Sequence, residues 1–210
     1  SSDDGRELAT LTLPNAAILS MATNPVSDAI AFGLRDSTVR VWNPMTSEPL
    51  VILRGNLDGV RHVSWNNDGT LLAATSPEST RLFDWPARTN PVVLKSQYGT
   101  VRELVWSSDG KSLGACTEHL DVWQRDQNAL QRSVVLGSGG IEQTFGPSVS
   151  WCEKSHTVAT RRELTKLVLL DDQTGELRLE IPHDCTKLRS VAFNADGTRL
   201  VTSNYRSTTA

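Results

Sequence analysis

The side chains that could act as bases, nucleophiles or metal ligands lie far apart in the sequence. The histidines are His62, His119, His156 and His183. No two of them have the spacing of a metal-binding or general-base motif. The cysteines are Cys116, Cys152 and Cys185. They form no Cys-x-x-Cys pair and are odd in number, which argues against a zinc site and a disulfide framework and favours an intracellular compartment, cytoplasmic or nuclear.

Sequence motifs of known enzyme classes are absent as well. There is no Gly-x-Ser-x-Gly elbow, no His-Glu-x-x-His and no phosphate-binding Gly-x-x-x-x-Gly-Lys loop. The glycine cluster at residues 137–140 has no helix pattern after it. Because a phosphate cradle needs a helix N-terminus, we interpret this cluster as a connector. The sequence therefore predicts a chain that is not an enzyme and that holds no metal or cofactor.

The composition excludes some partners. The chain has 210 residues, of which 38% are hydrophobic and 21% charged, and its formal net charge is −3. This balance gives no basic footprint for nucleic-acid phosphates or anionic membranes, which attract clustered Lys and Arg. No apolar run approaches the roughly 20 residues of a membrane-spanning helix. We therefore expect no membrane partner, and neither nucleic acid nor a small molecule is the expected ligand.

An internal repeat predicts the elements that position these side chains. Residues 60–69, 101–110 and 188–197 each read as an apolar strand that an aromatic residue closes and that leads into Asp-Gly. The glycine supplies the positive φ of a tight hairpin, and apolar residues resume after it. Each segment is therefore predicted to form two strands joined by a turn. Weaker copies lie at residues 18–23 and 149–151, the latter with Lys154-Ser155 in place of Asp-Gly.

The period of the repeat is that of a four-stranded sheet. The residues that close the first strands, Trp65, Trp106, Trp151 and Phe193, are 41, 45 and 42 residues apart. Third strands are predicted at residues 37–43, 79–84, 120–124 and 165–171. Fourth strands are predicted at residues 48–53, 91–94, 133–136 and 176–181. Four strands in 40 to 45 residues are typical of one propeller blade.

The sequence resembles the WD40 repeat family, whose third strands end in Trp-Asp. The corresponding pairs here are Trp42-Asn43, Phe83-Asp84, Trp123-Gln124 and Leu170-Asp171. None keeps both residues, and the family's Gly-His before the first strand is missing. The resemblance covers almost the whole chain and implies an all-β propeller of four-stranded antiparallel blades. The divergence implies blades that are held together mainly by packing.

The resemblance also divides the chain into blades. We expect a fourth strand at 6–13, blades at 16–54, 60–95, 101–137 and 147–182, and a partial blade at 188–210. Two arrangements stay open. The two ends could share a fifth blade, or the chain could be part of a larger propeller. We favour the larger one, which the family resemblance makes seven-bladed, because a ring with an unfilled strand would expose unpaired edges.

In this family, the loops after the second and fourth strands commonly bind protein partners. Transferred to this chain, that loop face would contain Tyr98, Arg162, Tyr205, Arg35, Asp58, His119 and Phe145. Phe145 lies in the connector at 137–147, which is longer than its counterparts. Trp85 is a further candidate because it precedes Pro86 in a turn, where an exposed aromatic side chain could contact a partner. Tyrosine and arginine are frequent anchors of protein interfaces.

These observations predict a non-catalytic scaffold or sensor module for protein–protein interaction, either alone or as part of a larger multidomain protein or complex. Two alternatives remain. A propeller hydrolase or lyase would need charged side chains with shifted pKa values gathered in the central channel. A nucleic-acid-binding propeller would need a basic stripe with interleaved aromatic residues. Neither pattern is visible in the sequence.

Overall fold

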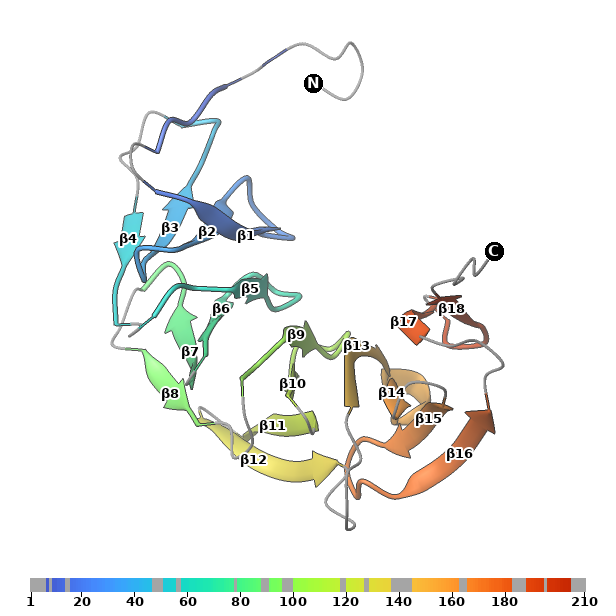
Figure 1. Cartoon of the computed structure of the whole chain (residues 1–210). Coiled ribbons are helices and arrows are strands. Elements are labelled where there is room, and N and C mark those ends of the chain that lie inside the picture. The colour runs from blue at the N-terminus through green and yellow to red at the C-terminus, as the bar shows by residue number, and fades with distance from the viewer. Residues whose placement is uncertain are drawn as a thin grey trace. The chain divides into compact units, whose positions relative to one another are not determined.

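A computed structural model of the chain consists of β-strands and one short 3-10 helix in the parts that it describes (Figure 1). The described residues are 7, 9–13, 16–46, 51–55, 58–77, 79–87, 91–95, 100–117, 120–126, 129–136, 145–162, 166–182, 188–194 and 196–204. Only the backbone is described at residues 125–126, 129–136, 145–148, 189 and 204. The chain forms two compact units, residues 1–94 and 95–210.

The first unit contains two four-stranded antiparallel sheets, each in chain order. The first sheet consists of β1 (Ile18–Thr23), β2 (Ile30–Leu34), β3 (Val39–Trp42) and β4 (Val51–Leu53). The second consists of β5 (His62–Trp65), β6 (Leu71–Ser76), β7 (Ser79–Asp84) and β8 (Val92–Leu94). The described part of the segment at 6–13, where a fourth strand is expected, belongs to no strand. A strand needs a partner to pair with, and no described segment pairs with this one.

The second unit contains two more four-stranded sheets and a two-stranded one. The third sheet consists of β9 (Glu103–Trp106), β10 (Ser112–Cys116), β11 (Leu120–Asp126) and β12 (Ala129–Leu136). The fourth consists of β13 (Phe145–Cys152), β14 (Thr157–Arg162), β15 (Lys166–Asp171) and β16 (Leu177–Pro182), and the helix η1 (Glu153–Ser155) follows β13. The hairpin consists of β17 (Leu188–Phe193) and β18 (Leu200–Asn204). The expectation of four-stranded antiparallel sheets is confirmed.

The second strands of these sheets form the centre of the core. All six residues of β6 and all five of β10 are buried, whereas β5 and β9 alternate between half-buried and buried residues. Alternate side chains point to opposite faces of a strand, so a strand buried at every position is covered on both faces. A Cβ atom at Gly114 would lie 3.3 Å from the ring of Trp151, so the glycine lets β10 lie close to the fourth sheet. The buried apolar positions therefore stabilise the stacking of one sheet on the next.

The hairpin turns between first and second strands follow the Asp-Gly signal, with one exception. Gly69, Gly110 and Gly197 have φ values of 70°, 69° and 73°. Between β13 and β14, His156 has a φ of 47°, and its backbone N–H donates to Glu153 O at 3.0 Å. In the repeat, Lys154-Ser155 aligns with Asp-Gly, which predicts the left-handed residue at Ser155. In the structure, the left-handed residue is His156 instead. Histidine is one of the residue types enriched in this conformation, although it carries a Cβ.

Candidate functional site

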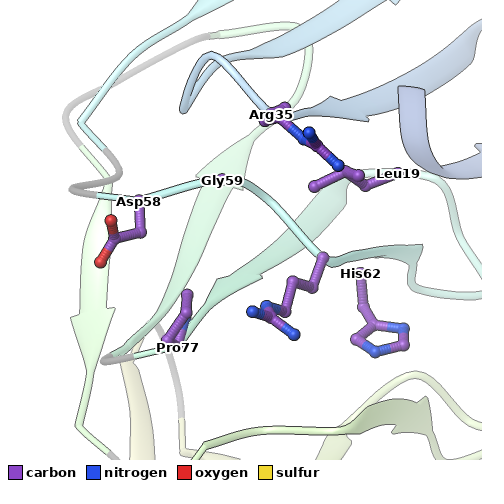
Figure 2. Close-up of a pocket in the computed structure, with 7 residues that line it drawn as sticks. Leu19, Arg35, Asp58, Gly59, His62 and Pro77 are labelled. Atoms are coloured by element: carbon purple, nitrogen blue, oxygen red, sulfur yellow. The ribbon is translucent and has the colours of Figure 1, made fainter. Parts of the chain in front are cut away.

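The first unit contains a pocket of about 640 Å³ where β2 ends and β5 begins (Figure 2). It is lined by Leu19, Arg35, Asp58, Gly59, Arg61, His62 and Pro77. These residues come from β1, from the β2–β3 and β6–β7 turns, and from the segment that enters β5. The pocket therefore lies at the loop end of the sheets, and every side chain that lines it sits beside a turn or a strand start.

Backbone hydrogen bonds hold the segments that form this pocket. Val60 N–H donates to Leu34 O at 2.9 Å, Arg35 N–H to Ala17 O at 3.0 Å, and Arg61 N–H to Thr75 O at 2.9 Å. Both bonds to residues 34 and 35 involve the turn that leaves β2. The pocket therefore has a fixed backbone frame, although its lining belongs to two sheets.

Two glycines allow the close approach of these segments. A Cβ atom at Gly33 would lie 2.8 Å from Val60 O, and one at Gly59 would lie 3.3 Å from the Cα atom of Arg35. Both neighbours are backbone atoms, which cannot turn aside as a flexible side chain can. These glycines are therefore needed for packing the entry of β5 against the end of β2.

The charges in the pocket are predominantly basic. Within the described part of the chain, the guanidinium groups of Arg35 and Arg61 make no ion pair and no hydrogen bond, and both residues are exposed. Burial, and then the charge of Arg61, lowers the pKa of His62. His62 is therefore a neutral hydrogen-bonding group at neutral pH. Asp58 is exposed and brings one carboxylate to the pocket.

The arginine next along the chain from Arg35 is already paired. Arg40 Nη2 lies 2.8 Å from Asp36 Oδ2. The hydroxyl of Thr38 donates to Asp36 Oδ1 at 2.5 Å, and the Thr38 backbone N–H donates to the same atom at 3.0 Å. These bonds, the hydroxyl bond first, lower the pKa of Asp36. Asp36 is thus occupied within its own turn and leaves Arg35 without a counter-charge there.

The second unit contains another pocket, of about 340 Å³, at the hairpin end of its sheets. It is lined by Ser107, Asp109, Lys111, Ser112, Gln124, Trp151, Glu153, His156, Asp172 and Gln173. The indole N–H of Trp151 donates to Asp172 Oδ2 at 2.8 Å, and His156 Nδ1 lies 3.4 Å from Asp172 Oδ1. The carboxylate of this Trp–Asp–His cluster is buried. Asp172 Oδ2 is therefore bonded within the cluster, whereas Asp172 Oδ1 makes no hydrogen bond to a described residue.

Glu103 and Cys116 of the second unit have raised pKa values but do not form a catalytic pair. Glu103 and Cys116 are paired across β9 and β10. Burial raises the pKa of Glu103 to about 7. Burial, and then the charge of Glu103, raises the pKa of Cys116 to about 12. A thiol that stays protonated at neutral pH is not a nucleophile, so this pair does not form an activated cysteine.

The structure brings together two of the predicted contact residues, Arg35 and Asp58, in the pocket of the first unit. Arg162 is partly buried in the second unit, where its Nη1 lies 3.4 Å from Glu180 Oε2 on β16 of the same sheet. Trp85 is half-buried and packs edge-on against Trp65, with ring centroids 5.7 Å apart. We expected an exposed aromatic at Trp85. Packing against the core covers part of its ring instead.

The other predicted residues fall elsewhere. Phe145 was expected in a connector, but it is the first residue of β13, and its side chain is not described. The strand reaches Phe145 because its backbone pairs with Arg162 beyond a bulge. Tyr98, His119 and Tyr205 lie outside the described residues.

Sequence reasoning missed Arg61 and His62, which line the pocket beside the predicted residues. Both stand at the start of the repeat segment 60–69 and were interpreted as strand residues. Arg61 and His62 are two polar residues between the apolar Val60 and Val63, which are buried. This pattern could have indicated them as surface residues at the start of the strand. A strand that begins at a rim presents its first polar residues to that rim.

Comparison with known proteins shows what class of protein this is. The four-stranded antiparallel sheets and the repeat of about 40 residues are those of a WD40-type repeat protein. The family model "WD domain, G-beta repeat" matches residues 5–43 and 47–84. Residues 5–43 and 47–84 therefore match the WD40 repeat family.

The curated relatives match only in part. The chain is 33% identical over 79 residues to "Probable cytosolic iron-sulfur protein assembly protein 1" of Candida glabrata, covering 33% of this chain and 23% of that protein. It is 31% identical over 86 residues to the protein of the same name from Kluyveromyces lactis, covering 36% and 26%. Coronin-7 of Pongo abelii is 34% identical over 74 residues, covering 35% and 8%. The match therefore spans about a quarter or less of each relative.

Two further searches of the described residues found nothing. No helix there is long and apolar enough to cross a membrane. Nor does that part of the chain bring three His, Cys, Asp or Glu side chains together as a metal site would require.

Proposed function

We propose that this chain is a non-catalytic protein-interaction scaffold, and that it binds a protein partner at the loops around the pocket of the first unit. The observation that carries the proposal is an open pocket of about 640 Å³, lined by two arginines that make no ion pair with any described residue. Arginine is among the residue types that contribute most to protein interfaces. Loops on a rigid sheet scaffold are where binding residues concentrate.

The family relationship supports the same function. WD40 repeat proteins typically act as protein-interaction scaffolds. Two of the relatives are named as assembly proteins, and their name places them in the cytosol. We propose an assembly role in the cytoplasm or nucleus for this chain as well, without transferring the relatives' iron-sulfur cargo.

The proposal extends to a larger propeller, seven-bladed by resemblance to the family. Leu179 and Ile181 occupy alternate positions of β16, beyond its bulge, and are 48% and 37% exposed. Alternate residues share one face of a strand, so β16 has an exposed apolar face. Such a face is expected where a further strand would pack.

Photo-cross-linking in cell extract tests the interaction surface. A photoreactive amino acid replaces Asp58 at the pocket or, as the matched control, Val26, which is 66% exposed in the β1–β2 turn of the same unit. We expect a partner to cross-link from position 58 and not from position 26. The cross-link should disappear when Leu19→Trp fills the pocket. Equal cross-linking from both positions, or a cross-link that Leu19→Trp does not change, would contradict the proposed surface.

A further inference from the structure

We propose that the pocket of the first unit binds an anionic group, a carboxylate or a phosphate, on an extended segment of the partner protein. This inference rests on the proposed function and names the chemistry that the partner must bring to the same surface. It begins from the two arginines, because no described residue forms an ion pair with either of them.

Arg35 and Arg61 are suited to bind an anion. A guanidinium group presents a planar fork of N–H donors that matches the two oxygens of a carboxylate or phosphate. Two other arginines of the first unit are occupied within the structure. Arg40 pairs with Asp36, and Arg81 Nη1 donates to Ser79 Oγ at 2.7 Å. Arg35 and Arg61 have no such partner among the described residues, and both line the same pocket.

His62 adds a hydrogen-bonding group without adding a charge. It is half-buried at the start of β5. Burial and the neighbouring Arg61 both lower its pKa, so no local negative charge outweighs the positive one around the ring. A bound anion would supply that negative charge. It would also raise the pKa of His62, because an opposite charge nearby favours the protonated imidazole.

The position of Asp58 gives the pocket a direction. Figure 2 shows Asp58 and His62 at opposite ends of the segment that contains Gly59, while Arg35 and Pro77 lie on either side of it. The anion is therefore expected toward Arg35 and His62, away from the carboxylate of Asp58. A second acidic residue directed toward Asp58 would be repelled. The pocket should accept an isolated anionic side chain better than a continuous acidic run.

The size and the remaining lining fit a peptide segment. A pocket of about 640 Å³ is within the usual range of about 300 to 1,000 Å³ for ligand sites and exceeds what one carboxylate needs. Leu19, which is 39% exposed, and Pro77 provide apolar surface beside the charged groups. These surfaces would contact the residues that flank the anionic side chain.

Fluorescence anisotropy with three labelled peptides tests the inference. The peptides share one neutral eight-residue sequence and differ at one central position, which holds glutamate, phosphoserine or glutamine. We expect the glutamate or the phosphoserine peptide to bind at least about tenfold more tightly than the glutamine peptide, as a charge-assisted hydrogen bond of about 1.5 kcal/mol would give. Binding of both acidic peptides indicates any acidic side chain, and binding of phosphoserine alone indicates a phosphorylated partner.

Four charge variants complete the test, three at the pocket and one as the control. Arg35→Gln and Arg61→Gln should each weaken binding of the acidic peptide about tenfold, and Asp58→Asn should strengthen it. Lys111→Gln removes the same charge from the exposed surface of the second unit and should change nothing. Thermal unfolding of each variant verifies the fold.

Two results would overturn the inference. One is equal affinity for all three peptides, and the other is an affinity that falls as much with Lys111→Gln as with Arg35→Gln. Cross-linking of a partner from position 58 could persist in either case, so loss of the anion site would leave the proposed interaction surface standing. Loss of the cross-link would argue against the surface itself.

Discussion

The two pockets differ in how far their polar groups are already bonded. In the second unit, Asp172 accepts the indole N–H of Trp151 and lies beside His156, and the Ser108 hydroxyl donates to Glu153 Oε2 at 3.1 Å. In the first unit, the guanidinium groups of Arg35 and Arg61 make no bond to any described residue. Buried polar groups are normally satisfied, whereas exposed ones can be left for a ligand. The same repeat has thus produced one pocket whose groups bond within the fold and one that we propose as a binding site.

The largest expected effect concerns the stabilising pocket. Trp151 is 8% exposed and packs with Val149, Val158 and Val168. Trp151→Ala should lower the free energy of unfolding by about 3 to 5 kcal/mol, because it opens a cavity and removes the partner of Asp172.

The effect of Arg61→Ala on the free energy of unfolding is compared with that of Trp151→Ala. Arg61→Ala should change the free energy of unfolding by less than about 0.5 kcal/mol, since the side chain is exposed. Urea denaturation measures both values. A destabilisation by Arg61→Ala as large as that by Trp151→Ala would remove the distinction between the two pockets.

A smaller effect is expected on the pH dependence of the free energy of unfolding, at equivalent positions of the two units. His62 and Glu103 are the first residues of β5 and β9, three positions before Trp65 and Trp106, and burial disfavours the charged form of each. The pKa of Glu103 rises from 4.5 to about 7 on folding. Its neutral form contributes stability that is fully present below pH 4.5 and is lost as the pH rises through about 7. The loss should be on the order of 1 to 3 kcal/mol, because Glu103 is partly solvated.

His62 should act in the opposite direction. Its pKa is lowered in the folded state, so its contribution is present above pH 6.5 and is lost as the pH falls below that value. Denaturation curves at several pH values, measured with Glu103→Gln and His62→Gln, separate the two effects. If Glu103→Gln leaves the decline between pH 4.5 and 7 unchanged, burial of Glu103 is not its cause.

The sequence predicted the repeated hairpins well, because Asp-Gly forms a tight turn by local backbone geometry. It did not predict the turn at His156, because a left-handed histidine has no sequence signature of its own. It placed Phe145 in a connector, because the pairing that extends β13 depends on residues that are distant in sequence. Arg35 and Asp58 were found from their loop positions. Arg61 and His62 were not, because the start of β5 determines whether they face the pocket.

One NMR titration measures directly where an anionic peptide binds to the chain. The glutamate peptide is added to the ¹⁵N-labelled 210-residue chain while backbone amide and indole N–H signals are followed. We predict that the amides of Gly59, Arg61 and His62 shift and that the indole signal of Trp151 stays unchanged. Shifts at the Trp151 indole without shifts at Gly59 and His62 would contradict the assignment of binding to the first pocket.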